Sequence, residues 1–231
     1  MDNELQNGHK QRMEDSVHKF PDSEHGRHIS TQPEDYSDKN SGVPHTECIA
    51  TPVFIIGLPA SGKTTFGRAL AHRLGCTFID LDFYISQRFR ASVSEIFARE
   101  GEEGFRKKEA AMLREAGEME DVIVACGGGT PCFAGNMDYM LSRGLTVWLE
   151  ATEVRLLERL RAGRDKRPLV KNLKEEDLAA YIARTAAERN KFYSRAAVRI
   201  ESSRLENRCQ IDETITSFLA SIPVRLRLDN N

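Results

Sequence analysis

The stretch VFIIGLPASGKT occupies residues 53–64 and consists of an apolar run followed by a glycine-rich octapeptide. A helical pattern continues over residues 63–74, so the stretch has the strand, loop and helix order that a P-loop requires. Glycines at both ends of the loop let successive backbone N–H groups point at an anion, and the following helix adds its positive end. An ordinary strand-to-helix turn is the alternative. The context favours a nucleotide-binding loop, with Lys63 along the β- and γ-phosphates and the Thr64 hydroxyl as a Mg²⁺ ligand.

The composition predicts a soluble globular protein. A chain of 231 residues with 40% hydrophobic content can bury a core, and no apolar run is long enough for a transmembrane helix. The net charge of −2 argues against a nucleic-acid binder. The five cysteines are scattered without a CxxC pair, which predicts neither a disulfide framework nor a zinc site. We therefore expect a cytoplasmic protein, a monomer, with no nucleic-acid or membrane partner.

Residues 1–50 differ from the rest of the chain and are expected to form a disordered acidic tail. They hold ten acidic and five basic residues, net −5, which leaves 25 acidic and 28 basic residues, net +3, to the remainder. They lack the apolar segment of a secretory signal and are too acidic for a transit peptide. Five of the six histidines lie here at irregular spacing, which favours a solvated tail over metal capture. A folded domain is expected over residues 51–223, with a short C-terminal tail at 224–231.

From residue 52 onward, short apolar runs alternate with longer amphipathic stretches. This alternation is typical of βαβ units, and it predicts a three-layer α/β/α sandwich with a five-stranded parallel sheet. The expected strands lie at residues 53–56, 77–79, 122–125, 145–149 and 198–200. The expected helices lie at residues 63–74, from a capping box at 92–95 to about 101, 105–116, 153–160, 175–189 and 211–219.

The segment at residues 161–171 lies between two predicted helices and is densely basic, with Arg161, Arg164 and Arg167. A run of like charges is often only a solvated surface. In an α/β protein with a P-loop, such a segment is also typical of a lid that closes over phosphates. We expect a cationic lid loop here.

Two carboxylates follow the second predicted strand. Because ligands gather at the carboxyl ends of parallel strands, Asp80 and Asp82 could both face the nucleotide site. Their spacing places them on one side if the extended conformation continues. Asp80 could then hold Mg²⁺ and Asp82 could accept a proton from an acceptor hydroxyl. The alternative is two solvated acids at a strand exit, with Asp82 as a helix N-cap.

A second glycine-rich segment, Gly127, Gly128 and Gly129, follows the third predicted strand. Three glycines let the backbone approach a ligand closely, although a tight turn would use them equally well. Arg106 and Glu109 are three residues apart on a predicted helix. They could form a surface ion pair of little value, or Glu109 could orient Arg106 to grip a ligand carboxylate. Arg189 is a second candidate anion clamp.

Taken in order, these motifs resemble the shikimate kinase family, which is part of the P-loop nucleoside-monophosphate-kinase-like group. The resemblance extends over residues 52–222 and is carried by residues 57–68, 78–82, 100–106 with Glu109, 127–129, 167–169, and 188–190 with Tyr193. It implies ATP-dependent phosphorylation of the 3-hydroxyl of shikimate, giving shikimate 3-phosphate and ADP on the route to chorismate and the aromatic amino acids. Another small-metabolite kinase, such as a gluconate kinase, and a catalytically silent nucleotide-binding regulator are the alternatives.

The resemblance also implies roles for individual residues. Lys63, Asp82 and Arg167 would be catalytic, and Thr64 and Asp80 would bind Mg²⁺. Shikimate would contact Asp82, Arg106, Gly127, Gly128, Gly129 and Arg189. ATP would contact Pro59, Ala60, Ser61, Gly62, Lys63, Thr64, Thr65, Arg161, Arg164, Arg167 and Arg204. Cys126 departs from the family pattern, because the residue before the triple glycine is commonly Thr, Ser or aliphatic.

Overall fold

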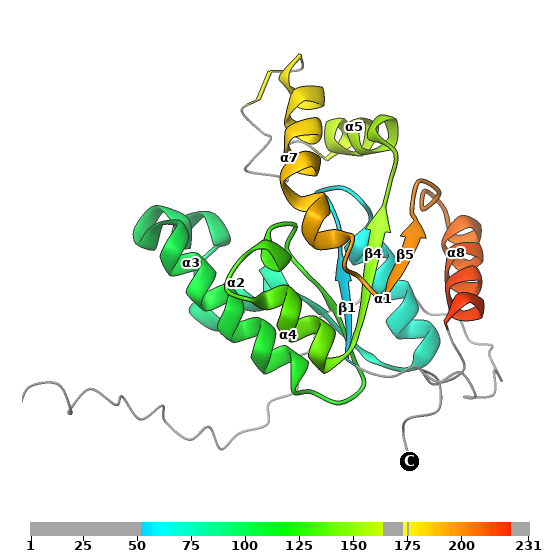
Figure 1. Cartoon of the computed structure of the whole chain (residues 1–231), viewed down its shortest axis with the longest axis horizontal. Helices are drawn as coiled ribbons and strands as arrows, with labels where there is room; N and C mark the ends of the chain where they lie inside the picture. Colours follow the sequence, from blue (N-terminus) through cyan, green and yellow to red (C-terminus); the bar gives the residue numbers. More distant parts are fainter. Residues whose placement is uncertain (1–51, 164–172, 175, 223–231) are drawn as a thin grey trace, which may run out of the picture. The chain divides into compact units, whose positions relative to one another are not determined.

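The computed structural model describes residues 52–163, 173–174 and 176–222, and within them the chain forms a five-stranded parallel sheet (Figure 1). Its strands have the spatial order β2-β3-β1-β4-β5. All four neighbouring pairs are parallel. The strand bounds are β1 Val53–Ile56, β2 Thr77–Asp80, β3 Val122–Ala125, β4 Leu145–Glu150 and β5 Val198–Glu201. The predicted α/β class and the five predicted strands are confirmed.

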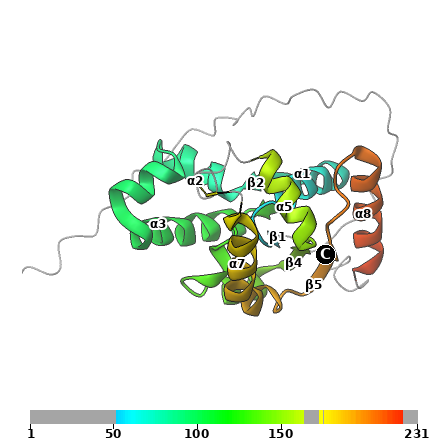
Figure 2. The same ribbon diagram turned by 90° about the horizontal axis from the view of Figure 1, so that it is seen from above.

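Alternate residues of the central strand supply the two halves of the core, because successive side chains of a strand point to opposite faces. Phe54 and Ile56 pack with α2, α3 and α4, whereas Val53 and Ile55 pack with α1 and α8. These two groups of helices lie on opposite sides of the strands in Figure 2. The bounds are α1 Lys63–Leu74, α2 Leu81–Phe89, α3 Val93–Gly117, α4 Asn136–Arg143 and α8 Arg208–Ser221.

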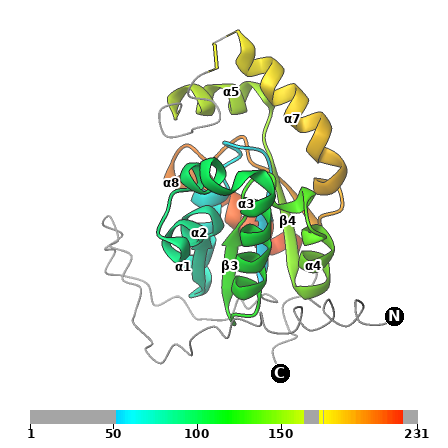
Figure 3. The same ribbon diagram turned by 90° about the vertical axis from the view of Figure 1, so that its left-hand side faces the viewer.

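Two further helices, α5 (Glu153–Ala162) and α7 (Asp177–Tyr193), lie side by side beyond the carboxyl ends of the strands (Figure 3). Leu156 and Leu160 of α5 pack on Leu178 and Ile182 of α7, and this small core also includes Ala60. The predicted basic lid connects these helices. Residues 164–172 and 175 lie outside the described part of the chain, so the lid, with Arg164 and Arg167, stays a prediction.

Local sequence signals explain where several helices begin and break. The Ser92 hydroxyl accepts from the backbone N–H of Glu95, and the Glu95 carboxylate accepts from the Ser92 N–H at 2.7 Å, which is the predicted capping box. Gly101 has φ 70° and interrupts the helical backbone, so the two helices predicted around it are parts of one kinked helix, α3. The predictions did not include α2, α4 or the 3₁₀ turn Thr130–Cys132.

The expected tails at residues 1–50 and 224–231 lie outside the described residues. In the described part of the chain, no helix combines the length and apolar composition that crossing a membrane requires.

Candidate active site

The strand order brings two glycine-rich loops together. β1 continues into the loop at residues 57–62, and its neighbour β3 continues into Gly127, Gly128 and Gly129. In the chain, β1 is followed by β2, which lies on the β3 side of the sheet, whereas β3 is followed by β4, which lies on the far side of β1. The chain therefore changes direction across the sheet between β1 and β3, and this pair forms a switch point. Ligands of open α/β sheets bind outside the carboxyl ends of strands at such a point.

The loop at residues 57–62 has the backbone shape of a phosphate-binding loop. Gly57 and Gly62 have φ values of 147° and 94°, in a region that favours glycine. A side chain at Gly57 would also place its Cβ 2.4 Å from the Leu149 carbonyl oxygen. The Lys63 ammonium donates to the carbonyls of Gly57 at 3.0 Å and Leu58 at 2.9 Å. The lysine is therefore curled over the loop whose N–H groups were predicted to bind phosphate.

The segment at residues 202–206, which follows β5, packs against this loop. The buried Ser202 hydroxyl donates to the carbonyl of Ser61 at 2.9 Å, and Leu205 lies so close to Gly62 that a Cβ there would be 2.6 Å away. Arg159 of α5 binds Glu206 at 2.8 Å and reaches the Ala60 carbonyl at 3.5 Å. Arg159 has no recognisable signal in the sequence, because nothing local links α5 to the loop.

Two arginines predicted for the nucleotide site, Arg161 and Arg204, lie in the described part of the chain. Arg204 forms an ion pair with Glu213 at 3.3 Å, and Arg161 lies exposed in the last turn of α5. Their contact with a nucleotide stays a prediction.

The Thr64 hydroxyl and Asp80 meet beside the loop. Thr64 Oγ1 lies 2.9 Å from Asp80 Oδ2, and Asp80 Oδ1 accepts from the Phe83 N–H at 3.3 Å. Asp80 is thus the N-cap of α2. The expectation that the extended conformation continues to Asp82 is wrong, as is the alternative of Asp82 as the cap. Helix α2 begins at Leu81, since the Asp80 side chain satisfies an N–H of its first turn.

Asp82 lies in the first turn of α2 and next to the triple glycine. A Cβ on Gly127 would be 2.9 Å from Asp82 Oδ1. Solvent still reaches the side chain, yet surrounding protein raises the pKa of Asp82 to about 6, with smaller contributions from the charges of Asp80 and Glu109. Lys63 and Arg106 oppose the increase. The carboxylate is therefore poised to exchange a proton near neutral pH.

Arg106 and Glu109 form a pair in which Glu109 is buried and Arg106 is partly buried, rather than a surface pair. Arg106 Nη1 lies 2.8 Å from Glu109 Oε2, and the Glu109 side chain is 1% exposed. The second Glu109 oxygen accepts from the fully buried Thr130 hydroxyl at 2.6 Å. The structure thus agrees with the alternative in which Glu109 orients the arginine.

Each glycine of the triple-glycine loop abuts one predicted site residue. Besides Gly127 against Asp82, a Cβ on Gly128 would be 2.9 Å from Arg189 Nη1, and one on Gly129 would be 2.8 Å from Arg106 Nη2. Any larger residue would displace one of these three side chains. Tyr193 of α7 donates to the Gly128 carbonyl at 2.5 Å and holds the loop against the helix that carries Arg189.

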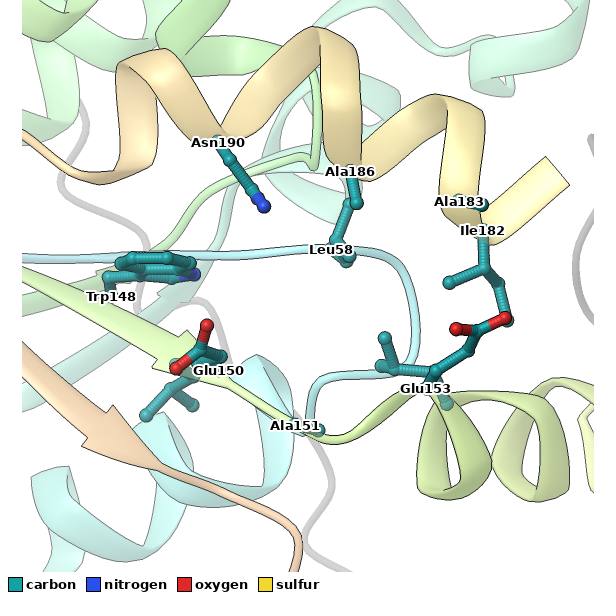
Figure 4. Close-up of a pocket in the computed structure, with 11 residues that line it drawn as sticks. Leu58, Trp148, Glu150, Ala151, Glu153, Ile182, Ala183, Ala186 and Asn190 are labelled. Atoms are coloured by element: carbon teal, nitrogen blue, oxygen red, sulfur yellow. The ribbon is translucent and has the colours of Figure 1, made fainter. Parts of the chain in front are cut away.

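A cavity of about 120 Å³ lies near this arrangement but contains none of its charged groups (Figure 4). It is bounded by the end of β4, the start of α5 and one face of α7, with Leu58, Trp148 and Asn190 among its lining residues. The acidic, basic and hydroxyl side chains discussed above gather instead at the ends of β1, β2 and β3. In the described residues no cluster of three or more His, Cys, Asp or Glu side chains could hold a metal by itself.

A phosphate-binding loop, a hydroxyl–carboxylate pair beside it and two arginines around a glycine loop define a P-loop kinase of small molecules. The family model described as "Shikimate kinase" matches residues 59–220, and the chain belongs to the shikimate kinase family.

Similar proteins agree with this membership. A shikimate kinase of Phocaeicola vulgatus is 42% identical over 168 residues, covering 73% of this chain and 96% of the relative. A crystal structure of shikimate kinase from Bacteroides thetaiotaomicron has a TM-score of 0.72 at 37% identity, covering 74% of this chain and 97% of the other. One from Acinetobacter baumannii in complex with shikimate has a TM-score of 0.64 at 30% identity, covering 78% and 94%.

Proposed function

We propose that this chain transfers the γ-phosphoryl group of ATP to the 3-hydroxyl of shikimate, giving shikimate 3-phosphate and ADP. The observation that carries the proposal is the convergence of Asp82, Arg106 and Arg189 on the three glycines after β3. Two guanidinium groups suit a carboxylate, and a carboxylate suits a hydroxyl, so the site matches a hydroxylated acid. Membership of the shikimate kinase family supports shikimate as that acid.

On the acceptor side, Arg106 and Arg189 would bind the shikimate carboxylate. The Glu109 carboxylate holds Arg106 at 2.8 Å and so fixes the direction of its guanidinium before the substrate arrives. Asp82 would accept a hydrogen bond from the reacting hydroxyl. Because the pKa of Asp82 is raised to about 6, the group is mostly ionised near pH 7 and basic enough to take the proton as the phosphoryl group transfers.

On the nucleotide side, the backbone N–H groups of residues 57–62 and the start of α1 would bind the phosphates. Lys63 would exchange its two loop carbonyls for phosphate oxygens and stabilise charge on the transferring group. Arg167 is proposed to act with Lys63 on the strength of the family resemblance. The nucleotide contacts proposed for Arg161, Arg164 and Arg204 have the same basis.

The described residues fit a Mg²⁺ ion of the kind that accompanies ATP. Mg²⁺ retains several waters and takes one or two protein carboxylates together with substrate phosphates, so a sparse protein site is sufficient. The Thr64 hydroxyl and the Asp80 carboxylate, 2.9 Å apart, provide such a site beside the phosphate loop. When bound, the ion would neutralise phosphate charge. A monomeric state and a cytoplasmic location remain sequence-based proposals.

A coupled assay of ADP release tests the proposal. The purified full-length chain is supplied with ATP, Mg²⁺ and one of three acceptors, namely shikimate, quinate or gluconate. We expect rapid release with shikimate only, and a product with one added phosphoryl group by mass spectrometry. Arg106→Lys is the matched variant, because it keeps the charge and loses the planar fork, and its shikimate KM should rise. Preference for gluconate, or ADP release that no acceptor stimulates, would refute the proposed reaction.

A further inference from the structure

The guanidinium of Arg106 is surrounded by more than its carboxylate partner. Its Cζ atom lies 4.0 Å from the ring centroid of Phe133, 5.3 Å from that of Phe105 and 6.0 Å from that of Phe97. Phe97 and Phe105 belong to α3 and are stacked on each other. Phe133 comes from a different part of the chain, four residues after the triple glycine, and is 38% exposed.

An exposed phenylalanine so close to a cation is best explained by the cation. A large apolar side chain at the surface keeps much of its area in water and gains little from burial, whereas a ring within about 6 Å of a guanidinium gains from the attraction between its quadrupole and the charge. Phe133 makes the shortest of the three contacts.

The segment at residues 130–133 also acts on Arg106 indirectly, through Glu109. Thr130 is fully buried, and its hydroxyl donates at 2.6 Å to the Glu109 carboxylate that binds Arg106 at 2.8 Å. The Thr130 carbonyl accepts from the Asn136 side chain at 3.0 Å, and Asn136 in turn accepts from Arg114 at 3.1 Å. The segment that carries Thr130 and Phe133 is thus tied to α3 and α4.

We propose that Thr130 and Phe133 position Arg106 for the acceptor carboxylate, Thr130 through Glu109 and Phe133 through its ring face. Glu102 and Glu109 together engage three N–H groups of the guanidinium. A guanidinium has five, so the hydrogen bonds among the described residues leave two, which is the number that a bidentate contact with a carboxylate uses. The inference rests on the proposed function, because it assigns the ligand of Arg106 as the carboxylate of the acceptor.

The physical reason lies in the ordering of a long side chain. An arginine side chain without restraining contacts loses rotamer freedom when it binds a ligand, and this entropy loss weakens binding. The contact with the Phe133 ring restrains the position of the guanidinium, and the hydrogen bond from Thr130 restrains the Glu109 carboxylate that binds it. Both restraints act before the substrate binds, so their removal should raise the acceptor KM and leave the phosphoryl-transfer step nearly unaffected.

Phe133→Leu is the first test, because an exposed position tolerates the change without unfolding. We expect the shikimate KM to rise about two- to fivefold, the equivalent of a cation–π contact of about 0.5–1 kcal/mol at an exposed site, with kcat within about twofold of wild type. Phe133→Tyr keeps the ring and should retain the wild-type KM. Phe89→Leu is the matched control, because it removes a similar contact with Lys108, 4.6 Å from the ring, and should not change the shikimate KM.

Thr130→Val and Thr130→Ser test the indirect effect through Glu109. Valine keeps the shape but leaves a buried Glu109 oxygen without its donor, so we expect a rise of about tenfold in shikimate KM. Serine restores the donor and should restore most of the affinity. The KM for ATP should stay constant in both variants, which separates a loss confined to the acceptor site from a distortion that extends to the nucleotide site. Thermal melts of both variants check that the folded state is populated.

A double-mutant cycle decides whether Phe133 acts through Arg106. In an Arg106→Met background, Phe133→Leu should change the shikimate kcat/KM by less than about twofold, since nothing remains to be positioned. Effects that simply add would mean that Phe133 contacts the acceptor directly, and an unchanged KM in Phe133→Leu would mean that the ring only packs. Either result overturns the inference. A wild-type chain that does not phosphorylate shikimate would instead refute the proposed function.

Discussion

Replacing Asp82 by Asn separates the chemistry of the site from its stability. The change keeps the size of the side chain and removes the charge that would accept the hydroxyl proton. With a pKa of about 6, the wild-type carboxylate is about nine-tenths ionised at pH 7 and can act as a base. A general base typically contributes about 10²- to 10⁴-fold, so we expect kcat to fall by that order. Nucleotide binding should persist, since the Asp82 carboxylate lies against Gly127 of the triple glycine.

The same change should stabilise the fold. Folding raises the pKa of Asp82 from 3.8 to about 6, so the folded chain binds more protons than the unfolded chain between these values. Stability of the wild type therefore falls as the pH rises from about 4 to about 6. At pH 7 the neutral Asn should be more stable by about 1 kcal/mol, less than the full shift implies, because solvent reaches the side chain and screens the repulsion. This advantage should shrink steadily on acidification and vanish below about pH 4.

Two measurements test both halves of this prediction. Turnover is followed by coupled ADP release at saturating shikimate and ATP, and stability by thermal melts between about pH 4 and pH 8. In the wild type, kcat/KM should fall as the pH drops through about 6, where Asp82 becomes protonated. Asp212→Asn, at an exposed position of α8, is the control and should change neither quantity. Full activity in Asp82→Asn, or a lower melting temperature at pH 7, would refute the assignment of Asp82.

Four other variants test the remaining parts of the site. Lys63→Ala should lower kcat far more than it changes the shikimate KM, as should Arg167→Ala, because both cations are proposed to meet charge that develops in the transition state; wild-type turnover would exclude that role. Asp80→Asn should keep the N-cap of α2, since an amide oxygen also caps, but raise the Mg²⁺ concentration needed for half-maximal rate; an unaltered Mg²⁺ titration would contradict the assignment. Gly128→Ala places a methyl group 2.9 Å from the mobile end of Arg189, so the shikimate KM should rise while the melting temperature changes little; the reverse pattern would show a purely structural glycine.

Local features of the fold could be predicted because their signals lie within a few residues. The apolar run before Gly57 forms β1, the capping box at Ser92 begins α3, and Gly75 ends α1 in a left-handed conformation. The sequence did not predict α2, which follows β2 directly. An Asp residue can end a strand or serve as a helix N-cap, and the sequence alone does not say which of these positions Asp80 occupies.

What the sequence by itself determined is the class of chemistry. An eight-residue P-loop has one backbone shape, so the phosphate loop, Lys63 and the Thr64 hydroxyl follow from the order of residues alone. The number of strands and their parallel arrangement follow in the same way from the alternation of apolar runs with amphipathic helices.

Only the tertiary structure decided which residues meet. The order β2-β3-β1-β4-β5 places the triple glycine next to the phosphate loop, and strand order depends on packing between segments far apart in the chain. The burial of Glu109 between Arg106 and the Thr130 hydroxyl, 21 residues further along, has the same origin. Periodicity describes the conformation of one segment at a time. Contacts between segments arise when several hydrophobic faces are buried together, and so they become visible only in the folded chain.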